Sequence, residues 1–451
     1  MTRPTAPTAH PLRWVPTLYL AEGLPFYAVA LIAGLMYKSL GVPNDQIAYW
    51  TGLIGFAWVF KCLWSPFLEA ASSKKLIVVL FQLTGGAALG LVALSLQLPT
   101  YFAVSIALLG VVALASATHD IAADGLYIAS LNRKQQAAYA GWQGAFFNAA
   151  KFISLGGLVI LAGHLEKSMA AGAAWSIIFG ILGVMLIALG LYHSWALPGT
   201  RNEQQQVSMQ SVFNTLVDVI REFFKKPGIW LAILFIILFR AGEGQIQTIG
   251  PLFLRDARAI GGLGLTTDQV GVVYGTAGTI AFLTGSVLGG YFASWLGLRR
   301  ALPWLILAMN VPNLVFFFLS STQPDHIGII ATALSFEMLG YGFGFVGLIL
   351  FIMQVVAVGK YQTAHYALGT GVMQLGFVLF KMISGDIQVS LGYQKFFIWV
   401  LVSALPVLIL TRFIKVPESQ DSPAMEATEA TESIGQPDTL SAAPSPQSAV
   451  N

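Results

Sequence analysis

The chain has 451 residues, and its composition excludes a water-soluble protein of that length. Apolar residues make up 56% of it, while Asp, Glu, Lys and Arg together make up only 10%. A soluble globular surface needs about 25% charged residues, and the single cysteine, Cys62, excludes a disulfide-stabilised scaffold. We therefore predict a protein that crosses a lipid bilayer many times, for which the net charge of +3 matters less than where the charges lie.

A helix that spans a bilayer needs roughly 20 mostly apolar residues. Twelve stretches of the sequence meet this requirement, so we predict an all-α membrane protein with twelve transmembrane helices. Their approximate ranges are 12–37, 47–68, 76–97, 101–130, 138–163, 172–196, 229–254, 270–296, 301–320, 327–355, 364–384 and 393–416.

The loops between these spans differ in their content of basic residues. Of the 24 Lys and Arg residues, fifteen fall on the side of the N-terminus and five on the other side. The remaining four lie inside predicted spans: Lys61, Lys151, Arg240 and Lys381. Because cytoplasmic loops carry an excess of Lys and Arg, we predict that both termini are cytoplasmic.

The polar segments divide the chain into four parts. We predict a first six-helix bundle over residues 1–196 and a second over 229–416, joined by a cytoplasmic linker over 197–228. Within the linker, residues 211–226 have the apolar spacing of an amphipathic helix that lies on a membrane surface. Residues 417–451 contain six acidic residues and no basic one, which is typical of a disordered acidic tail.

The two bundles also resemble each other in sequence. The segment Leu40–Ile47, LGVPNDQI, returns as Leu263–Val270, LGLTTDQV, and each leads from an outer loop into an even-numbered span. After the eighth span, Gly290–Arg300 is similar to a glycine-rich and basic loop motif of the major facilitator superfamily. Two parallel halves of six helices are the design of that superfamily, so we expect its fold and transport by alternating access.

Acidic residues inside a membrane are costly and are the first candidates for function. Those within the predicted spans are Glu22 on the first, Asp120 and Asp124 on the fourth, Glu243 on the seventh and Glu337 on the tenth. In the superfamily that the chain resembles, helices 1, 4, 7 and 10 line the central substrate path. We therefore expect these five carboxylates to face a polar cavity.

Asp120 and Asp124 are candidates for proton coupling or gating. Their spacing of four places both on one helical face, where two carboxylates compete for ionisation and one becomes a plausible proton carrier. We expect Glu22 to share this role, and His119 to extend a proton relay from the pair. The alternative is that the pair only bonds to Lys61 or Arg133 and holds one conformation.

We assign several other residues inside the spans to substrate binding, and we rank Lys151 and Lys381 lower because such lysines can snorkel or pair locally. Arg240 and Glu243 are three residues apart, and they form either a substrate clamp or a pair that neutralises itself along one helix. For Glu337 we expect either a substrate contact or a paired structural carboxylate. The full set of predicted substrate-binding residues is Arg240, Glu243, Glu337, Tyr19, Trp142 and Lys61.

Two motifs in the first half resemble a narrower group within the superfamily. Phe60–Pro66, FKCLWSP, is similar to a segment of AmpG-type muropeptide permeases, and His119–Gly125, HDIAADG, is similar to a stretch shared by those permeases and acetyl-CoA transporters. The resemblance implies proton-driven import of anhydromuropeptides across a bacterial inner membrane for peptidoglycan recycling. The alternatives are an importer of a siderophore or another small molecule with this fold, and a membrane sensor or scaffold that does not transport.

The remaining expectations concern cofactors and partners. The six histidines show no metal-ligand spacing, and no nucleotide-binding fingerprint precedes a soluble domain. We expect no metal and no cofactor other than the proton gradient, and no enzymatic activity. As partners we expect a small-molecule substrate and the lipid bilayer, no nucleic acid, and a monomeric chain.

Overall fold

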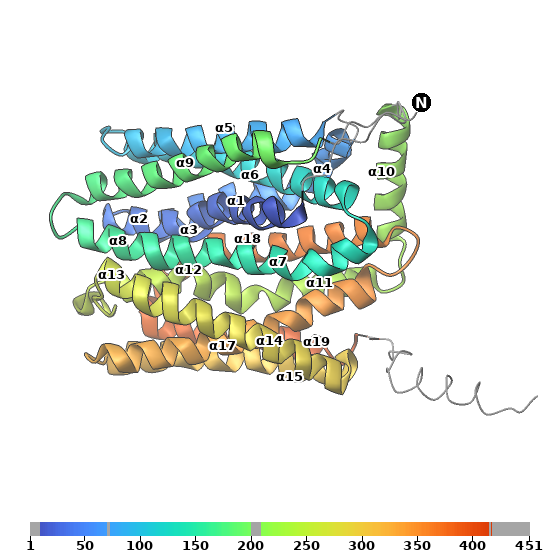
Figure 1. The fold of residues 1–451 in the computed structure, drawn as a ribbon. Coiled ribbons are helices and arrows are strands. Elements are labelled where there is room, and N and C mark those ends of the chain that lie inside the picture. The colour runs from blue at the N-terminus through green and yellow to red at the C-terminus, as the bar shows by residue number, and fades with distance from the viewer. Residues whose placement is uncertain (1–9, 70–72, 200–208, 415, 417–451) are drawn as a thin grey trace, which may run out of the picture.

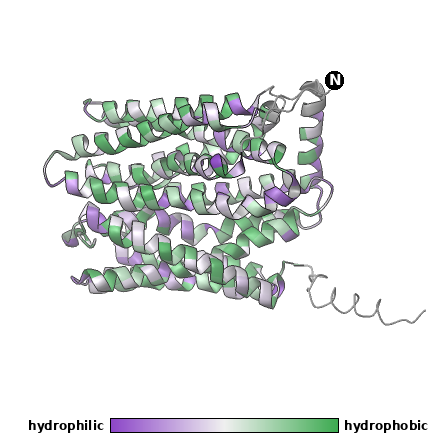
Figure 2. Ribbon diagram, viewed as in Figure 1, coloured by the Kyte–Doolittle hydropathy of each residue, from purple (hydrophilic) through white to green (hydrophobic). Residues whose placement is uncertain are grey.

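The computed structural model describes residues 10–69, 73–199, 209–414 and 416, and every regular element within these ranges is a helix. The acidic tail predicted for residues 417–451 lies outside them. Eleven helical stretches in the described ranges are long and apolar enough to cross a membrane. Most of the helices run nearly parallel (Figure 1). Hydrophobic positions predominate along the helices, and hydrophilic ones lie at helix ends and at a few positions in the middle of the bundle (Figure 2).

The first half of the chain supplies six of these stretches, and two of them contain a π-helical segment. π-Helical turns are rare and often mark functional positions. The elements in order are α1 (Val15–Tyr27), the π-segment η2 (Ala28–Ile32), α2 (Ala33–Ser39), α3 (Asn44–Ile54), α4 (Phe56–Glu69), α5 (Lys74–Ser95), α6 (Tyr101–Ser130), α7 (Arg133–Lys151), the π-segment η3 (Phe152–Leu158), α8 (Val159–Leu165) and α9 (Ala171–Ala196).

The second half supplies five stretches and also contains two π-segments, and its fifth stretch, Ala364–Leu410, covers the last two predicted spans. The break within that stretch is Gly392, whose φ of 72° is in the left-handed region that favours glycine. The elements are α11 (Ile229–Phe239), α12 (Ala241–Arg255), α13 (Thr267–Val270), the π-segment η5 (Gly271–Ala277), α14 (Gly278–Leu296), α15 (Leu298–Asn310), α16 (Leu314–Thr322), α17 (Ile327–Phe351), the π-segment η7 (Ile352–Val356), α18 (Gln362–Ser403) and α19 (Leu405–Leu410).

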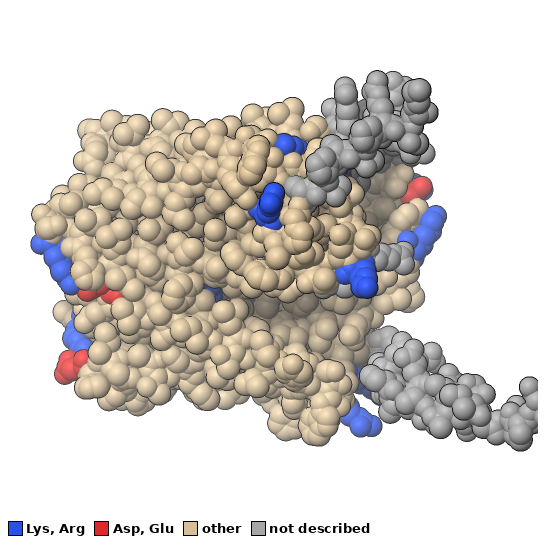
Figure 3. All heavy atoms as spheres, viewed as in Figure 1, with Lys and Arg blue, Asp and Glu red and all other residues tan. Residues whose placement is uncertain are grey.

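Helix α10 (Met209–Phe224) falls within the predicted linker and lies across one end of the bundle, roughly perpendicular to the other helices (Figure 1). We call this the α10 end. The turn that follows α10 is tied to the second half, because Lys226 donates to the carbonyl of Val356 at 2.5 Å. On the face drawn in Figure 3, the coloured side chains at the α10 end are mostly Lys and Arg, whereas basic and acidic side chains adjoin each other at the opposite end.

The two halves are joined at the end opposite α10, which we call the sealed end. Asp256 of the second half accepts from Lys38 at 2.5 Å, from Asn44 at 3.1 Å and from Tyr393. Backbones also approach closely there, since a Cβ added to Gly163 would lie 2.1 Å from the amide nitrogen of Asp268. A larger residue at position 163 would therefore force the two halves apart.

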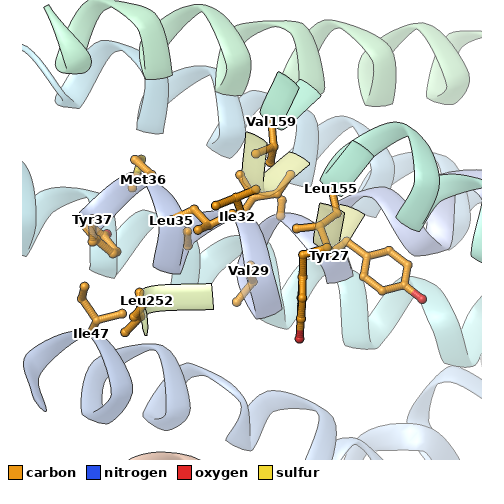
Figure 4. Packing of buried hydrophobic residues seen from close by; sticks show 14 of the residues in the cluster. Tyr27, Val29, Ile32, Leu35, Met36, Tyr37, Ile47, Leu155, Val159 and Leu252 are labelled. Carbon is orange, nitrogen blue, oxygen red and sulfur yellow. The ribbon is translucent and has the colours of Figure 1, made fainter. Parts of the chain in front are cut away.

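Next to the sealed end, toward the interior of the bundle, the two halves also pack together through a buried apolar cluster. It contains Val29 and Ile32 of the first stretch, Val159 of α8 and Leu252 of α12 (Figure 4). All four side chains are at most 1% exposed. The halves are thus packed together near the sealed end, and the polar residues described next lie farther toward the α10 end.

Candidate substrate and proton site

Three carboxylates meet between α1 and α6. One oxygen each of Glu22, Asp120 and Asp124 lies within 4.8 Å of the others. We call these three residues the acid cluster. The sequence pattern places Asp120 and Asp124 on one face of a helix, and the structure brings Glu22 of α1 to that same face. Asp124 is exposed while the other two are half-buried, so other residues leave the cluster uncovered on the side of Asp124.

One cation contacts the acid cluster. Lys61 of α4 forms an ion pair with Asp120, and their side chains are 30% and 13% exposed. For Asp120 and Asp124, the alternative to proton coupling is a bond to Lys61 or Arg133 that holds one conformation. The structure contains such a bond to Lys61 for Asp120 and not for Asp124. Lys61, predicted to bind substrate, therefore serves as the counter-ion of Asp120. Asp124 and Glu22 have no ion pair within the described ranges, and Oε2 of Glu22 is buried there without a hydrogen-bond partner.

Asp124 is instead held by a hydrogen-bond chain from two other helices. The hydroxyl of Tyr19 donates to Asp124 at 2.8 Å, and the side-chain amide of Gln143 on α7 donates to Tyr19 at 2.6 Å. Tyr19 is only 4% exposed, so it positions the carboxylate and offers little surface to a ligand. Sequence reasoning missed Gln143, because one amide in a transmembrane helix has no spacing that reveals its partner.

Trp142, the neighbour of Gln143, makes no polar contact with the acid cluster among the described residues. Its ring is 42% exposed and stacks on Phe146 of the same helix, with ring centroids 5.8 Å apart. No hydrogen bond from its indole to another described residue is present, and successive residues on a helix point about 100° apart. A role of Trp142 in substrate binding therefore stays a prediction.

His119 is buried on another face of α6, in a chain of polar contacts through the first half. Its Nε2 lies 2.8 Å from the amide nitrogen of Gln82, and Oε1 of Gln82 lies 2.9 Å from Nδ1 of His193. The second ring nitrogen of His193 is 3.0 Å from the hydroxyl of Thr17. These contacts tie together α1, α5, α6 and α9. The structure thus directs the ring of His119 away from the acid cluster.

A second charged group lies in the other half, where α11 and α12 meet. Arg240 forms an ion pair with Glu243, and Glu243 also accepts from the hydroxyl of Tyr341 at 2.5 Å. The guanidinium lies 4.7 Å from the ring centroid of Phe377. Of the two possibilities for Arg240 and Glu243, the structure contains the internal pair. Nε of Arg240 is nevertheless buried without a partner among the described residues, so the guanidinium keeps a free donor.

Glu337 of α17 is a buried carboxylate, and the charge that faces it comes from the other half. Its side chain is 2% exposed, and Oε2 has no hydrogen-bond partner in the described part of the chain. Lys151 of α7 is 6% exposed, lies 4.5 Å from the ring centroid of Phe282, and interacts electrostatically with Glu337 and Glu243. Sequence reasoning ranked Lys151 below the acids, although a lysine inside a span is itself a functional signal.

The fold and these two charged groups define a class of protein. Eleven apolar helical stretches in the described ranges form two similar halves with acidic and basic side chains between them, which is the construction of a secondary transporter. The model of the Major Facilitator Superfamily matches residues 17–385. The chain belongs to that superfamily and is a multi-pass membrane transporter.

Within the superfamily, the chain is similar to AmpG-type permeases. It is 25% identical to the anhydromuropeptide permease of Escherichia coli K12 over 403 residues, which cover 87% of this chain and 77% of that one. A Rickettsia conorii protein whose name carries AmpG is 23% identical over 416 residues, which cover 88% of this chain and 94% of that one. The resemblance seen in the sequence motifs thus extends over most of the chain.

Solved structures of other transporters share the fold. The nucleoside transporter NupG superposes with a TM-score of 0.66 at 14% identity, over 89% of this chain and 98% of that one. A bacterial homologue of the human lysosomal transporter Spinster, in an inward-facing and unoccupied conformation, has a TM-score of 0.67 at 14% identity, over 89% and 95% of the two chains. At this identity the likeness concerns the fold alone.

Proposed function

We propose that the protein is a proton-coupled importer that carries anhydromuropeptides across a bacterial inner membrane by alternating access. The observation that carries the proton coupling is the acid cluster. Glu22, Asp120 and Asp124 approach within 4.8 Å, while Lys61 is the one counter-ion within ion-pair distance among the described residues. Because a charge in the bilayer interior costs at least about 2.5–3.5 kcal/mol, three ionised carboxylates beside one ammonium are unfavourable. Binding a proton at the cluster removes part of that cost.

The proposed topology has twelve crossings, with both termini and α10 on the cytoplasmic face. The break at Gly392 supports dividing the last helical stretch into two crossings, and the basic α10 end supports its cytoplasmic placement (Figure 3). Residues 1–196 and 229–416 would form the two moving bundles of a monomer. In this arrangement the sealed end faces the periplasm, and the structure represents a state closed to the outside.

Alternating access then requires that the contacts at the sealed end break. The ion pair of Lys38 with Asp256 and that of Lys167 with Asp268 both join the two halves there. A proton on the acid cluster shifts the equilibrium between inward-open and outward-open states only if it binds one state better than the other. Asp124 is exposed in this conformation, which makes it the group that exchanges its proton with water on the cytoplasmic side.

The substrate class is supported by the relatives and by the chemistry of the second half. A muropeptide carries sugar hydroxyls, amides and carboxylates, and the region between the halves offers partners for all three. In the described ranges, Arg240 keeps a free donor, Glu337 keeps a free acceptor, and Lys151 is held over a ring without a carboxylate within ion-pair distance. We propose that these three residues contact the substrate.

The test is uptake of labelled anhydromuropeptide by membrane vesicles that contain the protein. We expect wild-type uptake to require a proton gradient, and Asp124→Asn to reduce the gradient-driven rate at least about tenfold. Asp325→Asn is the matched control, because it removes an exposed carboxylate far from the acid cluster. Absence of uptake at saturating substrate would overturn the muropeptide assignment and point to another small-molecule substrate or to a non-transporting sensor. Uptake at an unchanged initial rate with an uncoupler present would overturn the proton coupling.

A further inference from the structure

Lys381 is a buried cation between the two halves. It lies on α18 and is 4% exposed. Its ammonium donates one hydrogen bond, of 3.2 Å, to the backbone carbonyl of Ala30 in the π-segment η2 of the first half. No ion pair joins it to an acidic residue within the described ranges. An ammonium has three donors, and a buried charge without a counter-charge is costly. An anion bound at this position would therefore be stabilising.

The space beside Lys381 contains a second free hydrogen-bond donor. A small cavity there is lined by Thr51 of the first half and by Gln247 and Thr248 of the second. Oε1 of Gln247 accepts from the hydroxyl of Tyr274 at 2.8 Å, and its amide nitrogen is buried without a partner among the described residues. The hydroxyl protons of both threonines are used within their own helices. The free donors are therefore the ammonium and the amide.

The cavity lies between the acid cluster and the sealed end and is nearly closed in this conformation. Its volume is only about 20 Å³, which is enough for a single water molecule. A larger group can enter only after the halves separate at the sealed end, which is the end that would face arriving substrate under the proposed topology.

We propose that Lys381 and the amide of Gln247 form a subsite for a carboxylate of the transported substrate. This inference rests on the proposed function for the identity of the substrate, but not for the chemistry of the subsite. A carboxylate supplies the negative counter-charge that Lys381 lacks, and its oxygens can accept hydrogen bonds from both free donors. Charge-assisted hydrogen bonds of this kind are among the strongest in proteins. The subsite is distinct from the acid cluster and from the pair of Arg240 and Glu243.

The subsite lies at a contact between the two halves. The hydrogen bond from Lys381 to the carbonyl of Ala30 crosses from the second half to the first. A carboxylate can bind the two donors of the ammonium that this carbonyl leaves free. The bound anion would then lie beside a contact between the halves, where separation of the halves changes its surroundings.

The first experiment measures binding to the purified full-length protein without any assumption about the transported substrate. The probes are N-acetyl-alanine, which has one carboxylate, and its amide, which is neutral. We expect the carboxylate to raise the thermal unfolding temperature and the amide to leave it unchanged. Lys381→Gln should weaken carboxylate binding about 10- to 100-fold, as expected for a lost charge-assisted hydrogen bond, and Gln247→Leu should weaken it about tenfold.

Lys395→Gln is the matched control, because Lys395 is an exposed lysine of the same helix, α18, and is not among the residues proposed to contact the substrate. This variant should bind N-acetyl-alanine like the wild type. Equal binding by Lys381→Gln and the wild type, with the variant eluting as a folded species, would overturn the proposal. Stabilisation by the carboxylate that is the same in all variants would indicate a general salt effect and would overturn it too.

The second experiment uses uptake and separates this inference from the proposed function. Vesicles are supplied with labelled anhydromuropeptide or with the same compound in which the carboxylates are amidated. We expect Lys381→Gln to raise KM for the acid form about 10- to 100-fold and to leave KM for the amidated form unchanged. A wild type that transports neither compound but binds N-acetyl-alanine through Lys381 would refute the substrate and keep the subsite. Equal KM increases for both compounds would overturn the subsite.

Discussion

Tyr19 and Asp124 are 105 positions apart in the sequence, and a hydrogen bond of 2.8 Å joins the hydroxyl of the first to the carboxylate of the second. The same hydroxyl accepts from Gln143, so three helices are fixed around one carboxylate. Because Asp124 is exposed, this chain determines the direction in which its carboxylate faces water. The contact therefore connects the packing of α1, α6 and α7 to the proposed exchange of a proton.

Replacement of Tyr19 by Phe tests that connection. The variant removes the hydroxyl and keeps the ring, so we expect a loss of only about 0.5–1.5 kcal/mol in stability and a fall of roughly 3- to 10-fold in gradient-driven uptake. Initial uptake rates per folded molecule measure the effect. Tyr127→Phe is the matched control, because Tyr127 contacts Tyr19 edge to face but donates to a backbone carbonyl, that of Gln136. Wild-type uptake by Tyr19→Phe would contradict the positioning role.

The ion pair of Lys61 and Asp120 leads to a second prediction. Lys61→Met leaves Asp120 beside two other carboxylates without this cation, and we expect the free energy of unfolding to fall by about 1–3 kcal/mol, less than for a fully buried pair because Lys61 is 30% exposed. The double variant Lys61→Met with Asp120→Asn removes both charges. It should recover most of the stability.

Thermal unfolding of the purified variants measures this coupling, since only a double-mutant comparison isolates a pairwise interaction. Uptake adds a second result. If Asp124 exchanges the proton, the double variant should keep measurable proton-driven uptake. The triple variant, in which Asp124→Asn is added to these two changes, should have no proton-driven uptake. Additive losses of stability in the double variant would show that the pair is not coupled and would refute the prediction.

The sequence predicted the composition of the acid cluster because the relevant information is local. A spacing of four residues places Asp120 and Asp124 on one helical face, and Glu22 lies on a helix that the resemblance to the superfamily places beside the same cavity. The direction of the His119 ring was not predictable in the same way. It lies about 100° around the helix from Asp120, and only the packing of α5 decides that Gln82 meets it there.

The roles of the buried lysines depended on contacts that no local pattern contains. Lys151 and Lys381 lie in different halves, and each faces the other half. Their surroundings are therefore fixed by how the halves pack, which is a property of one conformation and not of either helix. The twelve predicted spans likewise correspond to eleven continuous helical stretches in the described ranges, because the short connection near Gly392 leaves the last two joined.

Asp256 is a residue on which polar contacts at the sealed end converge, so its replacement by Asn should open that end. The variant loses the ion pair with Lys38 and weakens the bonds from Asn44 and Tyr393. We expect a larger population of the outward-open state. A cysteine in place of Thr51, which is 3% exposed behind the sealed end, reports this opening in a Cys62→Ser background.

The measurement is the rate at which a membrane-impermeant maleimide labels that cysteine from the side of the sealed end. Asp256→Asn should raise the rate at least about fivefold. Asp325→Asn is the control, since Asp325 pairs with Arg258 at 3.0 Å within the second half. An unchanged labelling rate in Asp256→Asn would mean that other contacts close this end.

Variants of His119 distinguish a structural role of this residue from a role in a proton relay. Its Nε2 accepts from the amide of Gln82, and that amide group also bonds to His193, so loss of the acceptor leaves a buried donor unpaired. We expect His119→Leu to lower the free energy of unfolding by about 1–3 kcal/mol, whereas His119→Gln keeps an acceptor and should lose less than about 1 kcal/mol. Because the ring is directed away from the acid cluster, His119→Gln should also retain at least about half of the wild-type uptake per folded molecule. Thermal unfolding and vesicle uptake are measured on the same variants. A variant that is as stable as the wild type but has lost proton-driven uptake would instead establish His119 as part of the proton path.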